Sequence, residues 1–130
     1  MDKASGKIII EAGLNVWPHE LRTAEALAKS GRTVQFVRKS EVDHEKAADI
    51  LIDGVPWELK SPTASNMKAI ERNLRRAVLQ AECVVFDSRR MKGLPDQAIE
   101  RELRACVQKR ARRLKHLLFV NRKGAVVDMS

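Results

Sequence analysis

The sequence contains no tyrosine, and three phenylalanines and two tryptophans give an aromatic content of only 4%. Proteins that bind unpaired bases commonly stack them on aromatic side chains, so a stacking platform of this kind is poorly supported. The two cysteines fall within apolar patterns, and we expect Cys83 and Cys106 to be buried, reduced thiols. No cysteine or histidine spacing predicts a zinc site. No apolar run approaches the roughly 20 residues that a membrane-spanning helix needs.

Length and composition indicate one soluble globular domain. The 130 residues are 44% hydrophobic and 32% charged, which is sufficient for one core and atypical of a disordered chain. We therefore expect residues 1–130 to form a single domain. The apolar run that follows Lys7 is too short for the core of a signal peptide, so we expect no export signal within this sequence.

Charge is distributed unevenly along the chain. Residues 1–65 carry 9 lysines and arginines against 10 acids, whereas residues 66–130 carry 16 against 7. Acidic residues can supply metal ligands and a basic surface attracts polyanions, so this asymmetry favours an enzyme that acts on nucleic acid. A basic surface that binds no ligand is the alternative interpretation.

The stretch 48–62, with the sequence ADILIDGVPWELKSP, predicts a β-hairpin. Strand-forming residues flank Asp53-Gly54, a dipeptide typical of two-residue hairpin turns. If these two residues form the loop, Ile52 lies opposite Val55, and the alternate apolar side chains of both strands share one face.

The same register predicts a charged opposite face. It places Asp49 opposite Glu58, and Lys60 joins them because side chains alternate along a strand. Two opposed carboxylates repel each other, and a divalent cation such as Mg²⁺ or Mn²⁺ between them would remove that penalty. The lysine could orient a water or stabilise negative charge on a phosphate. A solvated strand face without catalytic function is the alternative interpretation.

These residues resemble the signature of the PD-(D/E)xK nucleases, with Ala48 where the signature often has proline. A longer ordered set, which spans roughly residue 7 to the end, resembles the C-terminal tRNA-nuclease toxin domains of contact-dependent growth inhibition (CdiA-type) proteins. That set comprises His19-Glu20, Ala24, Leu27-Ala28, Gly31, Val34, residues 48–54, residues 57–62 and Gln80-Ala81.

The resemblance implies an α/β (α+β) fold with an αβββαβ core, a mixed sheet flanked by helices. The chain's own patterns predict the same order, extended by a C-terminal helix and a β-hairpin. The expected elements are a strand at 7–12, a helix at 18–31, a strand at 33–37, the hairpin at 48–62, a helix at 64–80, a strand at 83–87, a helix capped by Asp96 and a hairpin at 117–129.

The resemblance also implies a set of functional residues. Glu20 would join Asp49 and Glu58 as a metal ligand, although a carboxylate in a first helical turn can also simply complement the helix dipole. The metal would be Mg²⁺ or Mn²⁺, with Zn²⁺ as an alternative, and the Leu59 carbonyl would assist. We expect side chains around the site to bind substrate, namely Ser61, Gln80, Arg75, Arg76 and Arg112.

The function implied is that of a metal-dependent endoribonuclease toxin that cleaves tRNA. The resemblance further implies a cognate immunity protein, delivery as the C-terminal part of a large exported protein, and action in the cytoplasm of a target bacterium. Composition does not separate tRNA from DNA, so a DNA endonuclease of the same fold stays open. A non-catalytic nucleic-acid-binding domain is a further alternative, in which the carboxylates are only a surface pair.

Overall fold

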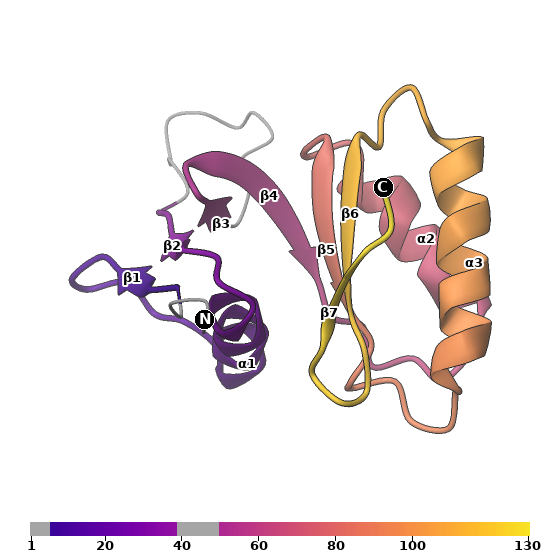
Figure 1. Cartoon of the computed structure of the whole chain (residues 1–130), viewed down its shortest axis with the longest axis horizontal. Coiled ribbons are helices and arrows are strands. Elements are labelled where there is room, and N and C mark those ends of the chain that lie inside the picture. The colour runs from indigo at the N-terminus through magenta and orange to yellow at the C-terminus, as the bar shows by residue number, and fades with distance from the viewer. Residues whose placement is uncertain (1–5, 39–49) are drawn as a thin grey trace, which may run out of the picture.

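The computed structural model of the protein describes residues 6–38 and 50–130. In this part of the chain, seven strands form one mixed sheet and three helices pack against it, which confirms the predicted mixed sheet flanked by helices (Figure 1). None of the helices in these residues is long and apolar enough to span a membrane. In chain order, the elements are β1 (Ile8–Ile10), α1 (Pro18–Lys29), β2 (Val34–Phe36), β3 (Ile50–Ile52), β4 (Val55–Lys60), α2 (Lys68–Ala77), β5 (Cys83–Asp87), α3 (Asp96–Lys109), β6 (His116–Val120) and β7 (Val126–Asp128).

The strands occupy the sheet in the order in which they occur along the chain, from β1 to β7. β1 is parallel to β2, and β4, β5 and β6 are parallel to one another. β3 is antiparallel to both of its neighbours, and β7 is antiparallel to β6. The carboxyl ends of β1, β2, β4, β5 and β6 therefore lie at one end of the sheet, which we call the carboxyl end.

Helices cover both faces of the sheet. The α1 helix packs Ala24 and Leu27 onto one face, and the α2 and α3 helices pack Ile70, Leu74 and Leu103 onto the other. Figure 1 shows a strongly curved sheet in which the long strand β4 links β1–β3 and α1 to β5–β7. β5 lies between the two cores and is buried along its whole length, as its continuous apolar run predicts.

The hairpin between β3 and β4 turns at Asp53 and Gly54, as predicted. Both residues have positive φ, 49° and 85°, which is the conformation that a type I′ turn requires. Ile52 pairs with Val55 in the expected register. Asp49 lies outside the described residues, so its position across the hairpin stays a prediction.

The α2 helix is shorter than predicted. It begins at Lys68 instead of Ala64 and ends at Ala77, before Gln80. The later start has a local cause, because the Asn66 side-chain oxygen accepts a hydrogen bond from the backbone N–H of Ala69 (3.0 Å). A side-chain acceptor of this kind satisfies a free N–H at a helix start and thereby favours initiation at that point.

Asp96 is not the N-cap of α3, contrary to the prediction. Pro95 holds the cap position, and Asp96 is the first helical residue. The two carboxylate oxygens of Asp96 instead accept the backbone N–H of Arg122, at 3.2 and 3.4 Å. Asp96 therefore ties the start of α3 to the turn between β6 and β7, a tertiary contact that local sequence does not reveal.

Both cysteines are free thiols and both are buried, as predicted. Cys83 begins β5 on the face covered by α1, whereas Cys106 packs from α3 into the other core. Burial raises the pKa of the Cys106 thiol to about 11. This thiol is therefore protonated and poorly nucleophilic near neutral pH.

An ion pair joins α2 to α3. The helical pattern predicts Arg110 on the outward face of α3, but it is half-buried and its Nη2 donates a hydrogen bond to Oε1 of Glu71. The hydrogen bond with Arg110 lowers the pKa of the Glu71 carboxyl below its ordinary value of 4.5. The charged form of Glu71 thus stabilises the folded protein at neutral pH.

This ion pair predicts a pH-dependent contribution to stability. Because the pKa of Glu71 is lower in the folded state, the contribution is present above pH 4.5 and is lost as the pH falls through the folded-state pKa. We expect the difference in Tm between the wild type and Glu71→Gln to be largest at neutral pH and to shrink in acid. A matched Glu82→Gln variant, which removes an exposed carboxylate, should have the same Tm as the wild type at each pH. A difference that stays constant across the acid range would contradict the prediction.

Candidate active site

β4 places two of the predicted catalytic residues on one face. Glu58 and Lys60 are two positions apart on the strand, so their side chains point to the same side of the sheet. Their register partners on β5 are Val84 and Phe86, which belong to the core under α2 and α3. Glu58 is 4% exposed, whereas Lys60 ends the strand and is half-buried. The pair therefore runs from the protein interior to the surface at the carboxyl end of the sheet.

The predicted metal site is not complete within the described residues. No group of three or more histidine, cysteine, aspartate or glutamate side chains in this part of the chain is arranged to hold a metal ion. Asp49 lies outside the described residues. The set of Asp49, Glu58 and Glu20 as metal ligands stays a prediction.

Glu20 lies in the first turn of α1, where its Oε1 accepts a hydrogen bond from the backbone N–H of Trp17 (3.1 Å). This contact satisfies an N–H at the helix start, the structural role that a first-turn carboxylate can have. With Phe36, which ends β2, and Val37, which follows it, Glu20 also lines a hollow of about 320 Å³. The carboxylate is therefore near the carboxyl end of the sheet, and its role as a metal ligand stays a prediction.

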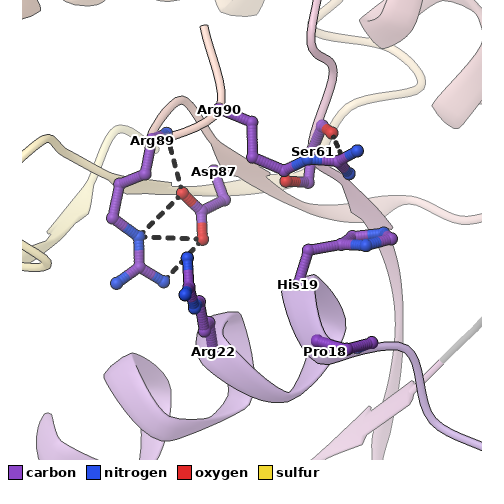
Figure 2. Close-up of a pocket in the computed structure, with 7 residues that line it drawn as sticks. All are labelled: Pro18, His19, Arg22, Ser61, Asp87, Arg89 and Arg90. Atoms are coloured by element: carbon purple, nitrogen blue, oxygen red, sulfur yellow. Dashed lines mark hydrogen bonds and ion pairs between the residues drawn. The ribbon is translucent and has the colours of Figure 1, made fainter.

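A cationic pocket of about 340 Å³ opens beside the end of β4 (Figure 2). Its walls come from the first turns of α1 and from the residues that follow β4 and β5. Arginines dominate the lining, so the pocket suits an anion. The lining residues are Pro18, His19, Arg22, Ser61, Asp87, Arg89 and Arg90.

The Asp87 side chain holds two other residues of this region in place by hydrogen bonds. Its carboxylate is 2% exposed and accepts a hydrogen bond from Oγ1 of Thr23 on α1 (2.6 Å). The side chain of Arg89 donates to both carboxylate oxygens, through Nε (3.1 and 3.2 Å) and Nη2 (2.8 Å). These hydrogen bonds raise the pKa of the Arg89 guanidinium. Asp87 therefore docks α1 against β5 and holds Arg89 in one orientation, in the manner of a two-pronged carboxylate–guanidinium pair.

Arg90 links the pocket to the candidate catalytic strand. Its Nη1 donates a hydrogen bond to the backbone carbonyl of Ser61 (3.0 Å), directly after Lys60. In Figure 2 the His19 side chain lies between the start of α1 and Ser61. The pocket thus begins one residue beyond the predicted catalytic lysine. Ser61 lines this pocket, and its role in substrate binding stays a prediction.

The arginines of this pocket could not be identified from the sequence, unlike Ser61. The local sequence gives no indication that a pocket contains Arg22, Arg89 and Arg90, because arginines are common on helices and in loops. One signal was present in the sequence: Asp87 ends an otherwise apolar, buried strand. A carboxylate at such a position requires a partner, and Arg89 follows two residues later.

The other predicted substrate-binding residues lie away from this pocket. Arg75 and Arg76 are in the last turn of α2, and Gln80 follows in the connection to the start of β5. Arg112 lies between α3 and the start of β6. The structure therefore places these exposed residues toward the opposite end of the sheet from Ser61, and their role in substrate binding stays a prediction.

Comparisons with known proteins identify a family and a similar fold. Residues 46–126 match the model of a family described as the contact-dependent growth inhibition CdiA C-terminal domain. The fold is similar to a solved structure described as a CdiA-CT/CdiI toxin and immunity complex from Burkholderia pseudomallei. The TM-score is 0.67 at 18% identity, and the alignment covers 95% of this chain and 98% of that chain. No curated protein matches the sequence.

Proposed function

The chain belongs to the family of contact-dependent growth inhibition CdiA C-terminal domains, and on that basis we propose that it is a toxin domain that cleaves tRNA with a divalent metal ion. The family assignment confirms the resemblance drawn from the sequence. The observation that carries the proposed activity is the pairing of Glu58 and Lys60 on one face of β4, at the end of the sheet where the arginine-rich pocket opens.

The order α1, β2, β3, β4, α2, β5 supports assignment to the PD-(D/E)xK nucleases, whose core is αβββαβ. In this assignment, Glu58, Asp49 and Glu20 would hold the cation, with help from the Leu59 carbonyl. Bound there, a divalent cation would neutralise phosphate charge and acidify a water. The carboxylate chemistry fits Mg²⁺ or Mn²⁺.

Lys60 has the second role in this proposal. Lys60 is the last residue of β4 and is half-buried, and its ammonium group would stabilise negative charge that develops on the scissile phosphate or orient the attacking water. Ser61 continues the strand into the cationic pocket. The pocket and Lys60 therefore lie at the same end of the sheet.

We also propose a cognate immunity protein as the partner of this chain. The similar Burkholderia structure is a complex of toxin and immunity protein, and the net charge of +8 suits an acidic partner. The family supports delivery as the C-terminal part of a large exported protein, with action in the cytoplasm of the target bacterium.

The direct test is to incubate the purified chain with total tRNA in Mg²⁺ or Mn²⁺, with and without chelator. We expect discrete fragments that require the metal, and sequencing of their ends would identify the cleaved nucleotide. Duplex DNA is assayed in parallel. Cleavage of DNA but not of tRNA would indicate that DNA is the substrate. Intact nucleic acid under all conditions would contradict nuclease function.

A further inference from the structure

A second hollow, of about 610 Å³, adjoins the cationic pocket and shares Arg22 and Arg89 with it. One wall is the solvent-facing side of α1, and another is the turn between β6 and β7. We call the two hollows together the basic groove. The second hollow is lined by Ile8, Arg22, Glu25, Ala26, Ala28, Lys29, Arg89, Lys123 and Gly124.

The groove carries an excess of positive charge. Among the described residues, its lining contains five arginines and lysines against two carboxylates, Asp87 and Glu25. Asp87 is neutralised by its ion pair with Arg89. The remaining cationic side chains extend from the end of β4 along α1 to the β6–β7 turn, and they are Arg22, Lys29, Arg90 and Lys123. A continuous row of this kind matches a polyanion rather than one small anion.

Arg89 joins the two hollows and is held in a fixed orientation. Asp87 binds its Nε and Nη2, and its Nη1 lies next to Gly124 in the β6–β7 turn, where an added Cβ would be 3.5 Å away. A guanidinium fixed before binding loses little conformational entropy when a ligand arrives. Arginine also suits phosphate in particular, because its planar fork can donate two parallel hydrogen bonds to phosphate oxygens.

We propose that the basic groove binds the phosphate backbone of the nucleic-acid substrate and leads it to the end of β4. This inference rests on the proposed function and adds the surface that holds the substrate, on α1 and the β6–β7 turn instead of α2 and α3. No phenylalanine or tryptophan lines either hollow, so the groove offers no large aromatic ring for base stacking. It therefore contributes affinity that depends on salt and not on base sequence.

The test measures binding without cleavage. Fluorescence anisotropy of labelled tRNA is followed in chelator, with Glu58→Gln in every protein, so the result does not depend on whether the chain is a nuclease. The groove variant is Arg22→Gln/Lys123→Gln. The matched control is Arg101→Gln/Arg104→Gln, which removes the same charge from exposed positions on α3. Circular dichroism confirms that each protein is folded.

We expect the groove variant to bind tRNA about tenfold more weakly, and the slope of log K against log salt to fall by about 1.5 to 2, as two lost phosphate contacts predict. The control should change the affinity less than about twofold. Equal losses in both variants would overturn the proposal, because they would indicate diffuse attraction. Unchanged tRNA affinity in the groove variant would also overturn the proposal. It would do so even if the same variant bound an acidic protein partner less tightly.

Discussion

We expect the Glu58→Gln variant to lose metal-dependent cleavage of tRNA by at least about 1,000-fold, equivalent to about 4 kcal/mol of activation free energy. Glutamine has nearly the shape of glutamate, so it fits the same buried position on β4. It lacks the negative charge with which the carboxylate would hold a divalent cation. Initial rates of fragment formation at saturating Mg²⁺ or Mn²⁺ measure the loss.

Glu82→Gln is the matched control for this experiment. It makes the same chemical change at an exposed position just before β5, outside the pocket, and should leave the rate unchanged. Metal titration adds a second readout, since removal of a ligand weakens the apparent metal affinity as well as the rate. A folded Glu58→Gln protein with wild-type cleavage would show that the catalytic carboxylate lies elsewhere.

The largest effect on stability is expected for Asp87→Ala, which should destabilise the fold by about 3 kcal/mol. Alanine leaves the hydroxyl of Thr23 without its 2.6 Å hydrogen bond and leaves the guanidinium of Arg89 without its ion-pair partner. Removal of one partner from such a buried network costs more than the network contributes in net terms, because the remaining polar groups stay desolvated. Urea denaturation measures the change.

Two further variants separate the parts of this effect. Thr23→Val removes only the hydrogen bonds of the Thr23 hydroxyl, to the Asp87 carboxylate and to the His19 carbonyl, and should cost about 1.5 kcal/mol. Glu82→Ala removes an exposed carboxylate close to the other end of β5 and should change stability by less than about 0.5 kcal/mol. If Asp87→Ala were no more destabilising than Glu82→Ala, the docking role of Asp87 would be wrong.

The elements of this fold are predictable where their signals are local. The Asp53-Gly54 turn determines the hairpin register, because two residues that accept positive φ define the loop and the loop length defines each opposed pair. Pro18 marks the start of α1, since its missing N–H costs nothing at that position. The same alternation correctly places Glu58 and Lys60 on one face of β4.

The cationic pocket is not predictable in this way, because three separate segments form it. Thr23 and Asp87 are 64 residues apart, and their hydrogen bond depends on where α1 docks on the sheet. Arg22 and Arg90 line the same pocket for the same reason. The prediction for Asp96 was wrong because of a tertiary contact. Aspartate is typical of helix caps, but the Asp96 carboxylate instead accepts the backbone N–H of Arg122. Tertiary contacts thus decide the role of polar residues whose local pattern is ambiguous.

The order of strands in the sheet has a consequence for how the chain folds. Across the described residues, each strand pairs with the strand that precedes it in the chain, so every pairing joins two consecutive strands. The entropy lost on closing a loop grows with its length, and proteins rich in local contacts fold faster. In the described residues, no pairing therefore closes a loop longer than the connection between two consecutive strands, which limits the entropy lost as the sheet forms.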